Sequence, residues 1–241
     1  MNDKSNNFGK LYLVPTPIGN LGDMTPRALE ILKVADVIAC EDTRTSGKLL
    51  SKFGLKKKML SYHEFNERAR ASQLLDALRR GETVAVVTDA GSPGISDPAY
   101  RVVRAALSER IEVVPLPGAN AVIPALTGSG LPTDRFMFEG FLSHKSGARI
   151  RRLEKLRTFE HTVVFYESPH RVRQTLAAML QVLGDRQACL AREISKKFEQ
   201  FIRGSLSEIL TKVGNGVKGE IVIVVAGAGD EPEDDIETDT D

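Results

Sequence analysis

Short apolar runs alternate with longer amphipathic segments through the first half of the chain. The runs are rich in Val and Ile and predict strands, while the segments between them have the apolar spacing typical of helices. The predicted strands are residues 11–14, 37–40, 59–62, 83–87 and 111–115. The predicted helices begin near residues 26, 44, 66 and 98, and another ends near residue 128. Regular strand–helix alternation predicts a parallel sheet with right-handed crossovers.

The stretch Gly130-Leu131-Pro132-Thr133-Asp134 interrupts this alternation and predicts a domain boundary. Beyond it the predicted strands are residues 136–142, 162–166, 187–192, 198–203 and 221–226. Helices are predicted over residues 146–158, from Ser168-Pro169 to about 183, and from a capping box at Ser205 and Glu208. The sequence therefore predicts an N-terminal α/β domain at 9–131 and a C-terminal α/β domain at 132–229.

Three loops rich in glycine and proline each follow a predicted strand of the first domain. They are residues 15–23, 88–98 and 116–121. Glycine lets the backbone turn sharply and approach a ligand, and the carboxyl ends of parallel strands meet at one edge of a sheet. The central loop, TDAGSPGISDP, is long for a strand–helix connection, and Asp97 with Pro98 predicts the start of the next helix. A ligand site is therefore predicted where the three loops converge.

The charge of the chain is unevenly distributed along its length. The formal net charge of the 241 residues is +1, but the segment 230–241 holds eight acidic residues and no basic one. Residues 1–229 thus carry +9, which suits a polyanionic partner, and the acidic tail is expected to be disordered. No apolar run is long enough to span a bilayer and the first ten residues are not signal-like, so we expect a cytoplasmic protein.

Motifs of several enzyme classes are missing from the sequence. It contains no Walker A, HExxH or GxSxG string, and its four histidines lack metal-ligand spacing, so no metal site is expected. Residues 214–219 match GxGxxG but precede a predicted strand instead of following one, which argues against a dinucleotide fingerprint. Cys40 and Cys189 lie in separate apolar runs and are expected to be buried thiols.

A basic segment follows the predicted boundary. Opposite a stripe of Ile150, Leu153 and Leu156, six cations stand against Glu154 alone: Lys145, Arg149, Arg151, Arg152, Lys155 and Arg157. These charges form either a solvated helix face or, together with residues 56–58, a rim that binds RNA phosphates.

Several long strings carry a resemblance to a known family. They are VPTPIGNLGDMTPRAL, CEDTRTS, TDAGSPGISDP, PLPGANA, LPTDRFMFEGFL, FYESPHR, AREISKKFEQFIRG and KGEIVIV. Together they strongly resemble the bacterial 16S ribosomal RNA (cytidine-1402)-2'-O-methyltransferase family, in the tetrapyrrole methylase class. The resemblance runs from about residue 11 to residue 227 and is far more specific than a short motif.

The resemblance implies a homodimer of two-domain α/β subunits, with a parallel sheet in the N-terminal domain and a mixed sheet in the C-terminal domain. It implies that S-adenosyl-L-methionine binds in the cleft between the domains and that 16S rRNA of the small ribosomal subunit is methylated. Carried over motif by motif, the donor site comprises Pro17, Ile18, Ala90, Gly91, Ser92, Ile95, Asn120, Ala121, Tyr166, Glu167 and Ile194. Backbone groups in such loops can hold the carboxylate, amine and adenine edges of the donor.

A ribose 2'-hydroxyl is a poor nucleophile until its proton leaves, so a proton acceptor or a nearby cation would assist transfer. The candidates from the matched strings are Asp42, Arg44, Glu167, Arg192, Glu193 and Lys197. Each could equally be a helix cap or part of a surface ion pair, and the sequence does not select the base among them.

Members of the family often carry a further helical region after the KGEIVIV strand, where this chain has its acidic tail. This departure bears on RNA docking more than on donor binding. Two alternatives stay open: a tetrapyrrole or other small-molecule methylase of the same fold, and a non-catalytic RNA-binding or ribosome assembly factor. The absence of Trp and the presence of only four Tyr argue against an aromatic ring-binding pocket.

Overall fold

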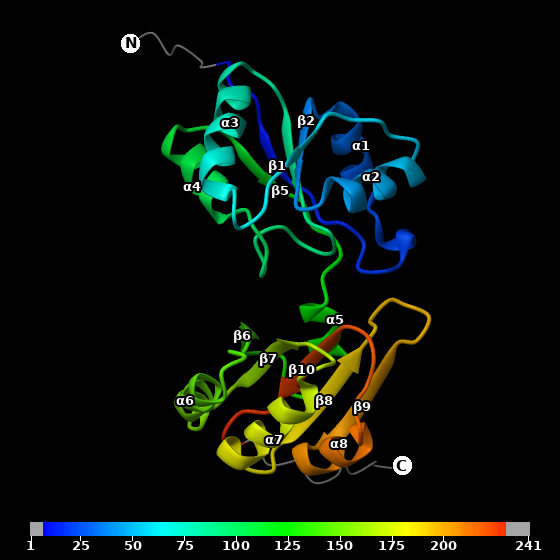
Figure 1. Cartoon of the computed structure of the whole chain (residues 1–241), viewed down its shortest axis with the longest axis vertical. Coiled ribbons are helices and arrows are strands. Elements are labelled where there is room, and N and C mark those ends of the chain that lie inside the picture. The colour runs from blue at the N-terminus through cyan, green and yellow to red at the C-terminus, as the bar shows by residue number, and fades with distance from the viewer. Residues whose placement is uncertain (1–6, 230–241) are drawn as a thin grey trace, which may run out of the picture. The chain divides into compact units, whose positions relative to one another are not determined.

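A computed structural model describes residues 7–229 of the chain (Figure 1). The predicted acidic tail, 230–241, lies outside the described residues. The chain divides between Asn120 and Ala121 into two compact units. Over the described range, no helix is both long and apolar enough to cross a membrane.

The first unit is built on a five-stranded sheet in which every strand pair is parallel, as the strand–helix alternation predicts. The strand order is β3-β2-β4-β1-β5. The strands are β1 (Leu11–Leu13), β2 (Val37–Cys40), β3 (Met59–Ser61), β4 (Val84–Val87) and β5 (Val113–Pro115). The helices are η1 (Leu21–Asp23, a 3-10 turn), α1 (Pro26–Val34), α2 (Thr43–Lys52), α3 (Glu67–Arg79) and α4 (Tyr100–Ser108).

Helices cover both faces of this sheet, and successive residues of a strand point to opposite faces. In β2, Val37 and Ala39 join the core cluster beneath α3 and α4. Ile38 and Cys40 join the separate cluster beneath α1 and α2. Figure 1 shows the two helix pairs on either side of the sheet. Burial on both faces explains why these strands read as continuous apolar runs and not as alternating ones.

The start of α4 differs from the prediction. Asp97 does not cap the helix, and Pro98 is not its first residue: α4 begins at Tyr100, and its N-cap, Ala99, makes no side-chain capping bond. Ser96 has a φ of +62°, a left-handed conformation that keeps the chain out of a helix at this point. The loop after β4 is therefore longer than predicted, and the Asp97 carboxyl is available for another role.

The second unit is built on a mixed five-stranded sheet, again as predicted. Its order is β6-β7-β10-β8-β9, with β6 and β7 parallel and the other pairs antiparallel. The strands are β6 (Phe136–Phe141), β7 (Thr162–Glu167), β8 (Gln187–Arg192), β9 (Gln200–Ser205) and β10 (Ile221–Val225). The helices are α5 (Val122–Thr127), α6 (Ser146–Leu156), α7 (Val172–Leu183) and α8 (Leu206–Val213).

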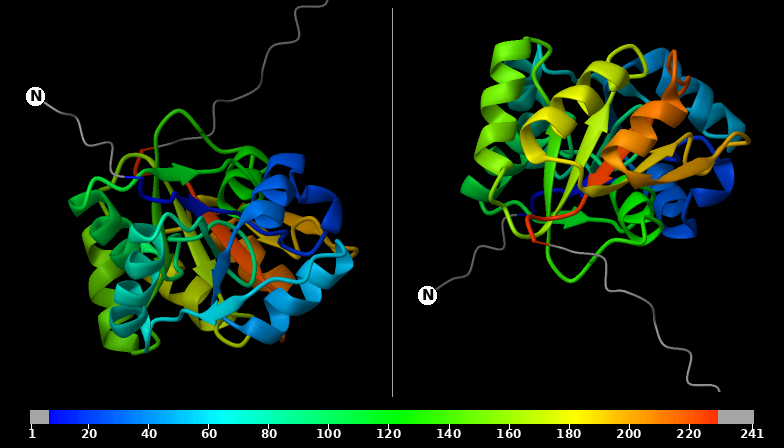
Figure 2. Two further views of the ribbon diagram at one scale, coloured as in Figure 1. Left: turned by 90° about the horizontal axis from the view of Figure 1, so that it is seen from above. Right: turned by 90° about the horizontal axis from the view of Figure 1, so that it is seen from below.

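Helices α6, α7 and α8 lie side by side on one face of the second sheet (Figure 2, right). They share one core cluster with alternate residues of the strands, including Phe165, Leu190 and Ile223. The capping box at the start of α8 is confirmed. Helix α7 starts at Val172 and not at Ser168-Pro169, which form a turn before it.

The boundary expected after Leu131 differs from the division between the two units. Helix α5 lies before the predicted boundary, yet it packs against β10 of the second sheet. Gly128, at the end of α5, also lies against the Phe201 ring of β9. The sequence between Ala121 and Leu131 therefore packs with the second unit.

Candidate functional site

Three of the parallel strands bring their carboxyl ends together at one edge of the first sheet. Strand β1 lies between β4 and β5, so the three glycine-rich loops that follow these strands are neighbours. The connection from β1 passes through α1 on one face, while the connection from β4 passes through α4 on the other. In open α/β sheets, ligands bind where the connections from two neighbouring strands pass to opposite faces of the sheet.

The loops after β1 and β4 are joined directly by hydrogen bonds. Thr16 and Gly91 exchange two backbone N–H···O bonds, each of 2.9 Å, in an isolated antiparallel bridge. The buried Thr16 hydroxyl donates to the Thr88 carbonyl (3.1 Å), and the Thr88 hydroxyl lies 3.2 Å from the carbonyls of Ala90 and Gly91. Because both threonine side chains bind backbone, the two loops form one rigid unit.

The loop after β5 is attached to both of the others. The Ser92 hydroxyl donates to the Ala119 carbonyl at 3.2 Å, which links the β4 and β5 loops. A Cβ placed on Gly118 would lie 2.7 Å from Cβ of Pro15, so only glycine allows this close approach between the β5 and β1 loops. The three loops thus converge as predicted, and each of them contacts the other two within the first unit.

The first unit holds seven of the predicted donor-site residues, and all of them belong to these loops. Pro17 and Ile18 are buried, and Ile95 is 44% exposed. Gly91 is buried with a φ of +86°, and a Cβ there would lie 3.5 Å from Cγ2 of Ile18. Glycine is therefore required at this position by the backbone conformation more than by lack of space. The seven residues are Pro17, Ile18, Ala90, Gly91, Ser92, Ile95 and Asn120.

A group of carboxyls at the same sheet edge was not among the predicted site residues. Asp97 lies in the β4 loop, and partial burial, followed by the charges of Glu41 and Asp89, raises its pKa to about 6. Burial, followed by the charge of Asp89, also raises the pKa of Glu41, which comes directly after β2. Both acids stand in the matched strings CEDTRTS and TDAGSPGISDP, but the sequence pattern assigned Asp97 to a helix cap.

Asp42 and Arg44, two of the predicted catalytic candidates, form a helix-capping pair. The Asp42 carboxylate accepts the Arg44 backbone N–H (2.7 Å) and the Arg44 Nη2 (3.1 Å) at the start of α2. These bonds from Arg44 lower the pKa of Asp42. The Asp42 backbone N–H donates to Oδ1 of Asp89 at 3.3 Å, which ties the β2 loop to the β4 loop. Asp42 therefore stays ionised and committed to its cap at neutral pH.

In the second unit, Glu167 is enclosed by its own partners. The residue is 3% exposed, and its carboxylate accepts bonds from the Ser168 backbone N–H (2.7 Å), the Thr175 hydroxyl (2.5 Å) and the Arg171 guanidinium (2.8 Å). These contacts fix the end of β7 against the first turn of α7. Tyr166, beside it, stacks edge-on against the ring of Phe138 at 4.9 Å between centroids.

The remaining catalytic candidates lie where β8 turns into β9. Arg192 donates from Nε to the Lys218 carbonyl at 2.8 Å. Glu193 has a φ of +51°, and its carboxylate accepts the Glu220 backbone N–H (3.0 Å) and the Lys196 ammonium (3.1 Å). The bond from the Glu220 backbone lowers the pKa of Glu193. Lys197 Nζ lies 5.6 Å from the ring centroid of the exposed Phe198.

Two further residues predicted for the donor site lie elsewhere in the second unit. Ile194 is buried after β8, and Ala121 precedes the first residue of α5.

Across residues 7–229, no group of three or more His, Cys, Asp or Glu side chains could hold a metal ion. Cys40 and Cys189 are buried free thiols, as predicted, and burial raises the pKa of each.

Comparison with known families gives a match over most of the chain. The family model described as Tetrapyrrole (Corrin/Porphyrin) Methylases matches residues 10–210. The matched segment includes the three interlocked loops and extends into α8 of the second unit.

Curated relatives with high identity share one name, "Ribosomal RNA small subunit methyltransferase I". The protein of Synechocystis sp. is 50% identical over 229 residues, covering 94% of this chain and 81% of the relative. The protein of Halalkalibacterium halodurans is 48% identical over 229 residues, covering 94% and 79%. The Bacillus subtilis protein is 44% identical over 237 residues, covering 98% and 81%.

Solved structures with the same fold are more distant in sequence. The crystal structure of diphthine synthase matches with a TM-score of 0.70 at 17% identity, covering 90% of each chain. Uroporphyrin-III C-methyl transferase from Thermus thermophilus, complexed with S-adenyl homocysteine, matches with a TM-score of 0.64 at 19% identity, covering 90% of this chain and 97% of that one. These likenesses establish the fold.

Proposed function

Since the chain belongs to the ribosomal RNA small subunit methyltransferase I family of the tetrapyrrole methylases, we propose that it methylates 16S rRNA. The reaction transfers the methyl group of S-adenosyl-L-methionine to the ribose 2'-hydroxyl of a cytidine. The observation that carries this proposal is identity of 44–50% to relatives of that name over at least 94% of the chain.

The loops after β1, β4 and β5 fit the methyl donor. Their positions are fixed by backbone and threonine hydrogen bonds among themselves, so they need no rearrangement to present backbone groups to a ligand. A carboxylate and an adenine edge are groups that such backbone donors and acceptors bind. When bound, S-adenosyl-L-methionine supplies the sulfonium methyl. The resemblance also assigns Ala121, Tyr166, Glu167 and Ile194 to donor binding.

Methyl transfer to an oxygen is an in-line displacement, and the attacking hydroxyl must lose its proton. Among the acids at the sheet edge, Asp97 has a pKa of about 6, so its carboxylate form dominates at neutral pH while its basicity is higher than usual. Asp42, Glu167 and Glu193 instead hold several hydrogen bonds each. We therefore propose Asp97 as the proton acceptor, with Arg44, Arg192 and Lys197 as cations available to a developing oxyanion or an RNA phosphate.

The protein's partners follow from this substrate. A body of charge +9 over residues 1–229 suits ribosomal RNA, in naked form or in the small subunit, and the cytoplasm is where this substrate is found. We also propose a homodimer, which the resemblance implies. Phe65 (88% exposed) and Tyr100 (67% exposed) of the first unit are large apolar side chains that an interface between copies would bury.

A transfer assay with tritiated S-adenosyl-L-methionine tests the function. Wild-type protein is offered naked 16S rRNA, 30S subunits from cells lacking the activity, and a porphyrinogen as the small-molecule alternative. We expect tritium to enter the 16S rRNA, offered either naked or in 30S subunits. The labelled linkage should resist alkaline hydrolysis, because a 2'-O-methyl group blocks cleavage of the adjacent phosphodiester. Label in the porphyrinogen alone would identify a small-molecule methylase, and donor binding without transfer to any substrate would indicate a non-catalytic factor.

A further inference from the structure

The N-terminus of α6 lacks the features that usually compensate a helix start. Its N-cap residue, Lys145, makes no side-chain capping bond, and its first turn contains no acidic residue. The first N–H groups of a helix have no acceptor within the helix, and the helix dipole makes this end positive. Helix α8, by contrast, begins with a complete capping box of Ser205 and Glu208. The start of α6 therefore presents free donors and positive charge together.

Arg149, one turn into the helix, supplies an independent observation. It is only 6% exposed, and its Nε has no hydrogen-bond partner. None of residues 7–229 forms an ion pair with it. Arg152 shows the usual arrangement, because its Nε and Nη2 both donate to the Glu139 carboxylate. A guanidinium withdrawn from water without a counter-charge is costly, so the position of Arg149 indicates an anionic ligand.

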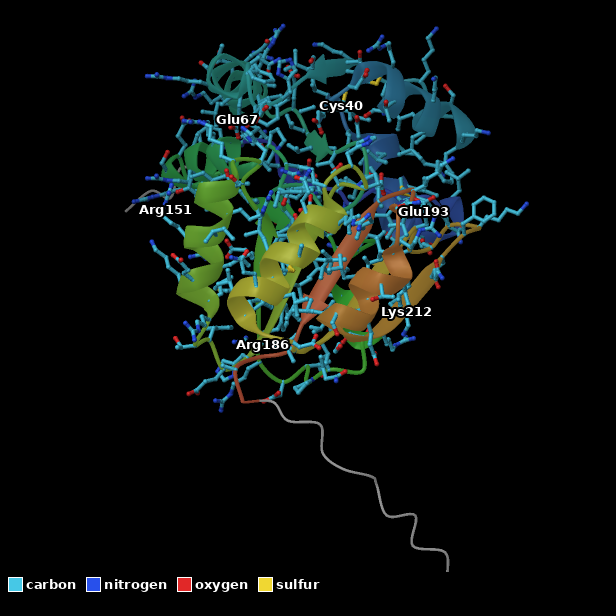
Figure 3. The ribbon with its side chains drawn as sticks, turned by 60° about the horizontal axis from the view of Figure 1, so that its bottom comes forward. Cys40, Glu67, Arg151, Arg186, Glu193 and Lys212 are labelled. Carbon is cyan, nitrogen blue, oxygen red and sulfur yellow. The ribbon has the colours of Figure 1, made fainter. Side chains whose placement is uncertain are left out.

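Arg149 is the fourth residue of α6. Because side chains on a helix lean toward its N-terminus, we expect this guanidinium to lie over the uncapped first turn. Only Nε is wholly enclosed, so the terminal nitrogens are the part of the group that an anion can reach. Arg151, which projects from α6 in Figure 3, approaches the same turn: a Cβ on Gly147 would lie 3.5 Å from its Nη1.

The adjoining loop does not cancel this positive charge. Strands β6 and β7 are parallel neighbours, so the loops that lead into α6 and α7 meet at one edge of the second sheet. Arg171 joins them, donating from Nη1 to the Leu142 carbonyl (3.4 Å) and from Nη2 to Glu167 (2.8 Å). The acid at this edge is thus already neutralised by its own arginine.

We propose that the N-terminus of α6 and Arg149 bind one backbone phosphate of the RNA substrate, with Arg151 at the rim. The proposal rests on the proposed function and names a contact of that substrate. A phosphodiester offers two oxygens, which match the fork of a guanidinium while the helix N–H groups bind from the other side.

The test compares Arg149→Met and Arg149→Lys with Lys155→Met, a control that removes an exposed charge from the last turn of the same helix. Affinity for in vitro transcribed 16S rRNA is measured by filter binding at several salt concentrations. We expect Arg149→Met to weaken binding about 10- to 100-fold and to flatten the log–log salt slope by roughly 0.7. We expect Arg149→Lys to lie between, and Lys155→Met to change affinity less than about threefold.

Thermal melting separates a binding role from a structural one. Because Arg149 is buried without a counter-charge, Arg149→Met should leave the melting temperature unchanged or raise it. A lowered melting temperature that accounts for the lost binding would overturn the proposal, as would an unchanged affinity and slope. A change of oligomeric state with RNA affinity intact would also overturn it. RNA binding is measured separately from methyl transfer. If RNA binding depends on Arg149 but the wild-type protein does not methylate the RNA, only the proposed function is contradicted.

Discussion

Thr16 and Gly91 lie on loops 75 positions apart in sequence, yet they exchange two backbone hydrogen bonds of 2.9 Å at the carboxyl edge of the first sheet. The bridge fixes the spacing of the loops after β1 and β4. Gly91 can take part because its φ of +86° turns its N–H and C=O toward Thr16. The candidate donor site thus depends on a residue whose backbone conformation other amino acids rarely adopt.

Replacing Gly91 with valine should reduce affinity for the methyl donor. A β-branched residue at this φ costs about 1–3 kcal/mol and would shift the bridge to Thr16. Gly54→Val is the matched control, since Gly54 has a φ of +69° and a Cβ there would meet no atom within 4 Å. Gly54 also precedes β3, an edge strand that is a neighbour of none of the strands before the three loops. Both variants should lose stability, but calorimetry should show weaker donor binding for Gly91→Val alone. Equal donor affinities in the two folded variants would contradict the assignment of this loop.

The raised pKa of Asp97 predicts a pH-dependent stability. A carboxyl whose folded pKa is about 6, against an ordinary value of 3.8, holds its proton more tightly in the folded state. Stability should therefore fall as pH rises from about 4 to 6. Asp97→Asn stays neutral and should melt at a higher temperature than wild type at a pH of about 7.5, with the difference vanishing near a pH of about 4. Asp134→Asn, at a carboxyl whose side chain is 79% exposed, is the control for the loss of one negative charge.

The same substitution tests the catalytic role of Asp97. If its carboxylate accepts the hydroxyl proton, wild-type turnover should decline as pH falls through about 6, and Asp97→Asn should be slower by about 100-fold or more at neutral pH. Donor affinity, measured separately, should change little. An Asp97→Asn variant with wild-type turnover and pH profile would return Asp97 to a purely structural role.

Glu167→Gln should destabilise the second unit. The change keeps the shape of the side chain but removes the charge that Arg171 and the Thr175 hydroxyl bind, at an expected cost of about 1–3 kcal/mol. Urea unfolding of Glu167→Gln, Thr175→Val and the double variant forms a double-mutant cycle. Because the two residues share one 2.5 Å bond, their effects should be less than additive. Strict additivity would show that the contact carries little energy.

The sequence predicted most of the fold because its signals are local. Apolar runs such as 37–40 and 84–87 are strands buried on both faces, and a run of that kind followed by glycine and proline indicates a strand and its loop. The parallel order follows from the alternation of elements. The link between Thr16 and Gly91 could not be predicted in the same way, because it depends on β1 and β4 becoming neighbours.

Two errors concern residues whose role is set by tertiary packing. Asp97 with Pro98 has the pattern of a helix start, but the left-handed Ser96 precedes it and α4 begins later. Arg149 was assigned to the helix face opposite the apolar stripe, although it is buried with Leu153 and Leu156. The spacing of these three positions, i, i+4 and i+7, is that of one helix face, so the pattern contained the signal. A charged residue at a core position was not expected there.

The acidic tail provides the last prediction, which depends only on charge. Residues 230–241 carry −8 and the remainder +9, so we expect the tail to compete in cis with RNA for the basic surface. Deleting it should raise RNA affinity, most strongly at low salt where screening is weakest. A full-length variant with every tail Asp and Glu changed to Asn and Gln is the control for chain length, and it should behave like the deletion. Donor affinity should be unchanged in both, because the tail contains none of the donor-loop strings. If deletion and neutralisation both leave RNA affinity and its salt slope at wild-type values, the tail does not interact with the basic body.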